Sequence, residues 1–141
     1  MTKRNKIIFR SIVITSIVIF IVIVIIRKRE FVSHLKANYT IVTGKITLIE
    51  VQHKSANCYA NYDFYFKNKL YHGYRGIDGI TYSDALNYFN NKCFPVLVDT
   101  LKPEYNAIMV TPDHFDKMNW VYPDSLGWVK KYYTKDFYAY W

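Results

Sequence analysis

The chain has 141 residues, enough for one domain of ordinary size, and a formal net charge of +8 that invites a nucleic-acid interpretation. The charge is unevenly placed, because residues 1–37 hold eight basic residues against one acid, whereas residues 38–141 are close to neutral. A domain without a basic surface lacks what phosphate binding requires. We therefore expect no nucleic-acid partner.

The run Ile7–Ile26 is dominated by isoleucine and valine and contains a single charge, Arg10. At about 1.5 Å per residue, a helix of this length covers the roughly 30 Å hydrocarbon core of a bilayer. Strands rarely exceed about ten residues, so a buried strand is excluded. No small-residue cleavage site follows the run, which is therefore predicted to be a membrane anchor that stays in the mature protein.

Basic residues flank this predicted anchor on both sides, so the rule that places positive charge in the cytoplasm does not settle the topology. We expect a single-pass protein of the bacterial inner membrane, with the bilayer as a partner and a slight preference for an extracytoplasmic domain. Residues 1–37 then form the basic tail, the membrane helix and a linker, and the folded domain occupies residues 38–131.

The first half of the domain has the pattern of three strands. Residues 39–53 change hydrophobic phase between Leu48 and Ile49, which indicates a β-bulge. Residues 58–67 alternate with a period of two, as expected for a strand with one buried face. The predicted buried side chains are Cys58, Ala60, Tyr62, Phe64 and Phe66. Asn68 tolerates left-handed geometry and marks a tight turn, after which the third strand returns.

A helical period then replaces the strand pattern over residues 82–89. Thr81 and Asp84 resemble a capping box at its start, and two asparagines end it at Asn91. We expect one short amphipathic helix here.

The stretch 91–115 contains a cysteine, a histidine, three prolines and several acids, so it is a candidate site. Alternating residues predict a fourth strand up to Asp99 and a fifth strand over residues 107–110. Asp99, Glu104 and Asn106 fall at the turn between them, where short polar side chains bond to nearby backbone N–H groups. We interpret the stretch as a β-hairpin. The predicted fold is thus a transmembrane helix plus a small mainly-β domain, an antiparallel sandwich or partly open barrel with one short helix.

The chain contains residue types that serve in metal and catalytic sites, but they are not spaced as in known motifs for such sites. The histidines and cysteines show no metal-ligand pattern, and no nucleophile motif or phosphate-binding loop occurs. We expect no metal, no cofactor, no small-molecule substrate and no enzymatic activity. Cys58 and Cys93 could pair in an exported domain, or they could be two half-buried thiols at strand starts.

The C-terminal residues 132–141 are unusually rich in aromatic side chains. Two interpretations stay open. In one, Phe115, Trp120 and Trp128 cover an open face of the sheet; in the other, the last ten residues dock onto a protein or the lipid interface. The candidate docking residues are Tyr132, Tyr133, Phe137, Tyr138, Tyr140 and Trp141.

Three groups of residues carry a resemblance to a known family. The domain starts with Thr43–Ile46, continues in a hairpin of alternating aromatic residues, and ends in a valine-rich strand with a turn. The hairpin residues are Tyr62, Phe64, Phe66, Asn68, Lys69 and Tyr71, and the last group is Val96, Val98, Asp99, Pro103 and Asn106. Over residues 43–110 the chain resembles the bacterial membrane-anchored "domain of unknown function 3592". Thr100 stands where that family commonly has proline, and Asn106 where it has serine. The resemblance implies a β domain, a membrane tether and no known chemistry.

These observations predict a single-pass membrane-tethered, non-catalytic binding or accessory module with a protein partner. One alternative is an immunity-like protein that neutralises a specific toxin. A strongly acidic concave face would favour it, and the near-neutral domain argues mildly against it. Another alternative is an accessory subunit of a membrane complex whose transmembrane helix makes the main contact. Ser11, Thr15 and Ser16 give only a weak small-residue signal for that role.

Overall fold

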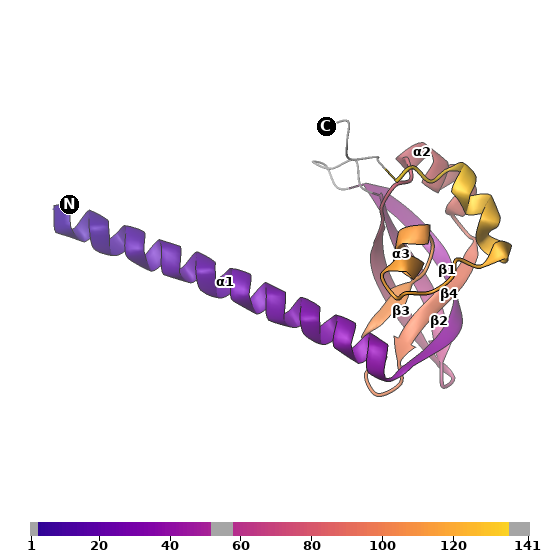
Figure 1. Ribbon diagram of the computed structural model, residues 1–141, viewed down its shortest axis with the longest axis horizontal. Helices are drawn as coiled ribbons and strands as arrows, with labels where there is room; N and C mark the ends of the chain where they lie inside the picture. Colours follow the sequence, from indigo (N-terminus) through magenta and orange to yellow (C-terminus); the bar gives the residue numbers. More distant parts are fainter. Residues whose placement is uncertain (1–2, 52–57, 136–141) are drawn as a thin grey trace. The chain divides into compact units, whose positions relative to one another are not determined.

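The computed structural model describes residues 3–51 and 58–135, with side chains from Ile12 onwards. Its backbone contacts divide the chain into two units, Met1–His34 and Leu35–Trp141. The first unit is most of helix α1 (Lys3–Ala37), drawn in indigo and violet in Figure 1. The second unit is the β domain, which begins three residues before the predicted boundary at residue 38.

Helix α1 exposes apolar side chains on every side. From Ile12 to Ile26 each described isoleucine, valine and phenylalanine is exposed, up to 68% for Phe20. The hydroxyl of Ser16 donates to the carbonyl of Ile12 at 2.9 Å, as expected for a serine in an apolar helix. Among the described residues, no helix combines the length and the apolar character needed to cross a membrane.

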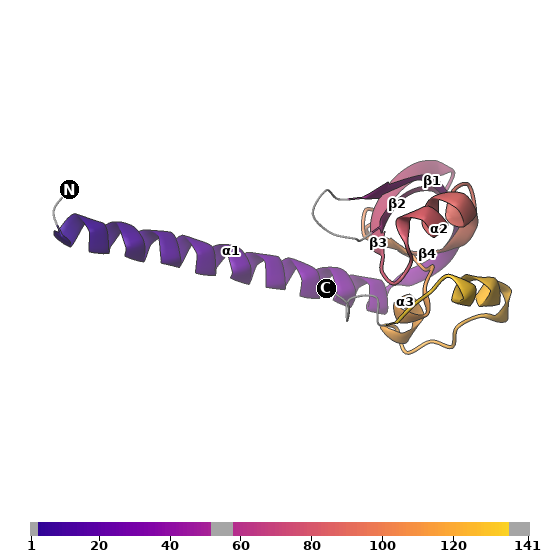
Figure 2. The same ribbon diagram turned by 90° about the horizontal axis from the view of Figure 1, so that it is seen from above.

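The β domain is built on one antiparallel five-stranded sheet with the order β3-β2-β1-β4-β5. Its strands are β1 (Tyr39–Val51), β2 (Cys58–Phe66), β3 (Lys69–Ile77), β4 (Cys93–Asp99) and β5 (Asn106–Ile108). The sheet curls into a half-barrel, and Figure 2 shows the segment after β5 lying on one side of it. The predicted small antiparallel β domain is confirmed, in the form of the partly open barrel.

Strand β1 is long because it pairs with β2 along one part and with β4 along another. The predicted bulge is present, but the register shifts between Ile46 and Leu48, one residue earlier than expected. Leu48 is consequently 48% exposed instead of buried. Gly44 leaves no room for a side chain, since a Cβ there would lie 2.4 Å from Cγ2 of Val96.

The hairpin between β2 and β3 follows the sequence prediction closely. Side chains of β2 alternate between buried and partly exposed from Cys58 to Phe64. The two turn residues, Lys67 and Asn68, have φ of 49° and 61°. Positive φ at both central residues is the signature of the type I′ turn, whose twist matches that of the flanking strands.

The hairpin between β4 and β5 confirms the interpretation of the stretch 91–115. The carboxylate of Asp99 is fully buried and accepts from the backbone N–H groups of Leu101 at 2.7 Å and Lys102 at 3.0 Å. The side-chain amide of Asn106 donates to the carbonyls of Pro103 and Glu104. Strand β5 ends at Ile108, two residues earlier than predicted.

The described part of the domain contains four short helical segments, two between β3 and β4 and two after β5. The predicted helix begins at α2 (Tyr82–Asp84), where the hydroxyl of Thr81 accepts from the N–H of Asp84 at 3.2 Å, and continues as the π-helical segment η1 (Ala85–Phe89). Helix α3 (Pro112–Asp116) and the 3-10 segment η2 (Asp124–Lys131) come after β5. One short helix was therefore an underestimate.

The core fills the inside of the curled sheet. Its largest fully buried side chains include Tyr62, Phe64, Phe89, Phe94 and Ile46. Trp128 of η2 packs on this core, with ring centroids 5.1 Å from Phe89 and 6.0 Å from Phe94. The segment after β5 thus covers part of the sheet, which agrees with the first of the two interpretations of the aromatic residues.

Candidate functional site

The two cysteines do not form the disulfide considered above, and both are free. Cys58 pairs with Val51 of β1 and Cys93 with Lys45, on opposite sides of that strand. Six residues of a strand span roughly 20 Å, far beyond the reach of a disulfide. Cys58 is buried and its thiol donates to the carbonyl of Ile80 at 3.3 Å, whereas Cys93 is exposed.

Two of the candidate docking residues of the C-terminal segment pack on the domain. Tyr132 stacks on Tyr88 with a centroid distance of 4.4 Å, and Tyr133 forms a β-bridge with Ile80. Both tyrosines are half-buried. The remaining four candidates, Phe137, Tyr138, Tyr140 and Trp141, lie outside the described residues. The domain therefore extends at least to residue 134, whose N–H donates to the carbonyl of Gly79 at 2.8 Å.

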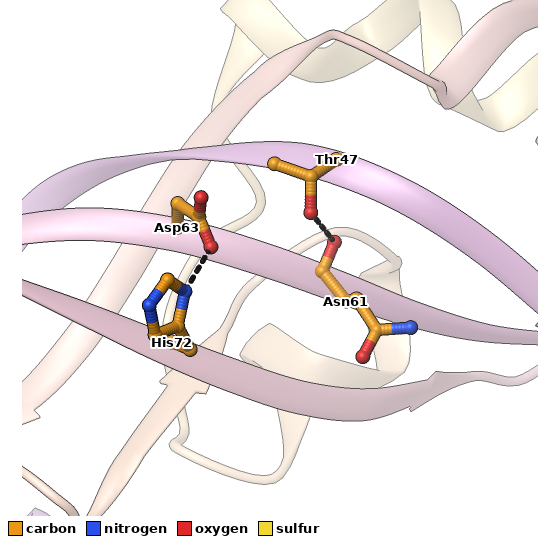
Figure 3. Close-up of polar contacts among 4 residues, drawn as sticks. All are labelled: Thr47, Asn61, Asp63 and His72. Carbon is orange, nitrogen blue, oxygen red and sulfur yellow. Dashed lines mark hydrogen bonds and ion pairs between the residues drawn. The ribbon is translucent and has the colours of Figure 1, made fainter.

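A polar pair lies on the outer face of the sheet, between β2 and β3 (Figure 3). Nδ1 of His72 is 2.6 Å from Oδ1 of Asp63, its direct cross-strand partner. The pair is solvent-accessible, with 72% of the His72 side chain exposed. The hydroxyl of Thr47 donates to the backbone carbonyl of Asn61 at 3.3 Å (Figure 3). It therefore has a hydrogen-bond partner other than His72. The pair is therefore an exposed cross-strand contact between β2 and β3.

Aromatic side chains adjoin this polar pair on the same outer face. Tyr59 and Tyr74 stack with centroids 5.1 Å apart and rings inclined by only 6°. Each ring therefore covers one face of the other, whereas Nδ2 of Asn61 on the same face is buried without a hydrogen-bond partner in the described part of the chain.

A second polar cluster lies inside the half-barrel, between the two edge strands. The hydroxyl of Tyr62 donates to Oδ1 of Asn106 at 2.7 Å and accepts from the N–H of Ile108 at 3.2 Å. Nη1 of Arg75 donates to the carbonyl of Ile108 at 2.8 Å. Two side chains from β2 and β3 thus satisfy both backbone groups of a β5 residue and link the edges of the sheet. Burial raises the pKa of Tyr62 to about 12 and lowers that of Arg75 below its usual value.

His114 of α3 belongs to the same region as Arg75. It is 2% exposed, and its Nδ1 accepts from the N–H of Val110 at 3.1 Å. Burial, followed by the charges of Arg75 and Lys117, holds its pKa well below the ordinary value. The neutral imidazole is required as an acceptor, so this histidine stabilises the start of α3.

A concave surface lies on another side of the domain, where η1, the start of β4 and η2 meet. It consists of two hollows of about 500 and 400 Å³ that share the side chains of Cys93 and Trp128. We call this surface the Trp128 groove. The first hollow is lined by Asn87, Tyr88, Lys92, Cys93, Trp128 and Tyr132. The second lies over the outer face of β1 and β4 and is completed by Ile41, Val42, Thr43, Phe94, Pro95, Ser125 and Leu126.

The Trp128 groove was not found from the sequence, although some of its residues were noted singly. Cys93 and Tyr132 were named as a disulfide and a docking candidate, and Trp128 as a cover for the sheet. Nothing in their spacing indicates that they meet, because they come from a strand, a turn and a 3-10 segment that are brought together only by tertiary packing.

Comparisons with protein-family models, curated proteins and solved structures find no match to this chain. The resemblance to "domain of unknown function 3592" therefore stays a prediction. Function has to be argued from the residues themselves.

Proposed function

We propose that this protein is a single-pass, membrane-tethered and non-catalytic binding module of the bacterial envelope. In this proposal Ile7–Ile26 cross the bilayer, and the β domain holds the binding surface. The observation that supports the tether is the uniform apolar exposure of helix α1 from Ile12 to Ile26. A helix that is apolar on all sides is stable only in an apolar environment, such as lipid or the interior of a larger protein.

The length of the apolar run supports lipid over a protein interior. The residues with described side chains, Ile12–Ile26, cover roughly 22 Å of helix, which is shorter than the hydrocarbon core. The sequence extends the run to Ile7, which gives roughly 30 Å. Basic residues at both ends would then lie among anionic head groups.

A binding role for the β domain is supported by its connectivity. The domain has the connectivity of the OB barrel. It consists of a three-stranded meander, a helix and two more strands, and its first strand pairs with the fourth. Barrels of this type bind oligosaccharides or oligonucleotides with their surface, without chemistry of their own. This support is by analogy, because a fold does not determine a function.

Carbonate extraction of membranes from cells that express the full chain tests the tether. We expect the protein to remain in the pellet. The double variant Val18→Lys/Val22→Lys should move to the soluble fraction, because each lysine at a helix centre costs about 3 kcal/mol of insertion free energy. The matched variant Val18→Leu/Val22→Leu should stay in the pellet. Release of the unmodified chain by carbonate would refute the tether.

A further inference from the structure

The Trp128 groove keeps part of its aromatic surface and one polar group accessible, although its rings stack on one another. Tyr88 is 45% exposed, and the described part of the chain provides no hydrogen-bond acceptor for the indole N–H of Trp128. Tryptophan N–H groups usually find a partner when they are removed from water. The groove therefore has an unused donor beside an exposed ring.

The rings of the groove are held in place from behind. Trp128 rests on Phe89 and Phe94, and Tyr132 rests on Tyr88 and lies edge-on to Trp128 at 6.4 Å. Rings that are already ordered lose little side-chain entropy when a ligand binds, which favours affinity.

The shape of the groove indicates an elongated ligand. Its two hollows lie next to each other with Cys93 and Trp128 as their common wall. A compact molecule would occupy one hollow only. A polyproline II segment has three residues per turn and a rise of about 3.1 Å, so its residues i and i+3 lie about 9 Å apart on one face. It could thus place one side chain on each side of Trp128.

The charged residues at the groove indicate the sign of the charge that a ligand would carry. Among the described residues that line the two hollows, Lys92 is the one with a charge, and none of them is a carboxylate. Lys45 lies directly opposite Cys93 in the sheet register, on the same outer face. An acidic group on the ligand would meet two lysines and no repulsion.

We propose that the Trp128 groove binds an extended, proline-rich segment of a partner protein that carries an acidic residue next to its prolines. Aromatic-lined grooves recognise polyproline II segments because such ligands are already extended and keep their carbonyls free to accept hydrogen bonds. The indole N–H of Trp128 is the donor for one of these carbonyls, and Lys92 pairs with the acidic residue. The proposal names a partner class for the binding role proposed above and rests on that role.

The experiment uses the full chain, labelled with ¹⁵N, in detergent micelles, and three synthetic peptides. The probes are a glutamate followed by six prolines, a lysine followed by six prolines, and a glycine-serine heptapeptide, all with blocked ends. Indole N–H resonances are followed during titration, and the variants Trp120→Phe and Trp141→Phe assign the resonance of Trp128 among the three tryptophans. We expect the acidic proline peptide to shift the Trp128 indole resonance, the basic one to bind about fivefold more weakly, and the glycine-serine peptide to cause no shift.

Two variants with a matched control locate the site. Lys92→Glu should reverse the preference between the acidic and the basic peptide. Tyr88→Ala should weaken binding of the acidic peptide by about fivefold or more, as expected for an aromatic side chain that contributes to an interface. Tyr74→Ala removes a tyrosine of similar exposure, 49%, on the outer face of β2 and β3 and should leave the affinity unchanged.

Several results would overturn the proposal. They are an unshifted Trp128 indole resonance at millimolar acidic peptide, an unchanged peptide preference in Lys92→Glu, or a loss of binding in Tyr74→Ala that equals the loss in Tyr88→Ala. A shift produced by a chitin hexasaccharide and by none of the peptides would assign the groove to glycans instead. None of these outcomes depends on insertion into a bilayer, so a failure here is distinct from a failure of the tether.

Discussion

The hydroxyl of Tyr62 offers a sharp test of how the half-barrel is held together. The Tyr62→Phe variant removes one oxygen atom from a side chain that is only 1% exposed, and it keeps the ring that packs against Phe64 at 6.2 Å. Two hydrogen bonds disappear, one to Oδ1 of Asn106 at 2.7 Å and one from the N–H of Ile108 at 3.2 Å.

The two losses differ in cost. The bond to Asn106 is a typical side-chain hydrogen bond with a net value of about 1 kcal/mol. The N–H of Ile108 is buried and would be left without an acceptor, which costs about 1 to 3 kcal/mol. Tyr62→Phe should therefore lower the free energy of unfolding by about 2 to 4 kcal/mol. In a domain of about 100 residues this corresponds to a fall in Tm of roughly 10 °C or more.

Thermal unfolding of the full chain, followed by circular dichroism of the β domain in detergent micelles, measures this effect. Tyr65→Phe is the control, because Tyr65 lies on the same strand, is 67% exposed and forms no hydrogen bond with its hydroxyl in the described part of the chain. It should change stability by less than about 0.5 kcal/mol. Equal Tm values for the two variants would show that the linkage between β5 and the rest of the sheet does not stabilise the fold as described.

Three further predictions concern other parts of the domain. Val96→Asp should destabilise the domain by several kcal/mol, because Val96 is fully buried. Glu104→Ala at the exposed turn should cost less than about 0.5 kcal/mol. The reverse order of the two variants in thermal melts would refute the hairpin. Because burial lowers the pKa of His114 from an unfolded value of about 6.5, its stabilising contribution is complete above that pH and is lost as the pH falls below it. Denaturant titrations between pH 7 and 5 should show a smaller loss of stability in His114→Asn, and identical pH profiles would contradict this. A membrane-impermeant maleimide applied to intact cells should label the exposed Cys93 if the domain lies outside. Cys58 should stay unlabelled, because it is buried and its thiol has a pKa raised to about 11. Labelling that persists in Cys93→Ser would contradict the burial of Cys58.

The parts of the fold that depend on local sequence could be predicted. The period of two in β2, the left-handed turn at Asn68, the cap at Thr81 and the buried turn carboxylate of Asp99 each follow from residues that are close in the chain. Such features are determined by backbone conformation and by short-range hydrogen bonds.

The parts that depend on contacts between distant residues could not be predicted. The link from Arg75 to Ile108 and the burial of His114 join segments more than thirty residues apart in the chain. The bulge was expected one residue too late because Leu48, although apolar, points to solvent. Sequence patterns show which residues are apolar, but they do not show which of them find a packing partner.

The same reason explains the candidate site. The Trp128 groove exists because η2 returns to the start of β4, and no motif in the sequence signals that return. Its residues could be predicted only singly, as a possible disulfide partner (Cys93), a docking candidate (Tyr132) and a cover for the sheet (Trp128), and their shared surface became visible in the folded domain.

Hydrogen exchange of the full chain in lipid vesicles tests the central claim of a membrane tether most directly. Backbone amides in the hydrocarbon core are removed from water, so the amides of residues 12–25 should remain unexchanged for hours, while those of residues 28–34 in the same helix should exchange much faster. Mass spectrometry of peptic fragments that cover both ranges gives the two rates. Equal and rapid exchange over both ranges would contradict a membrane-spanning helix.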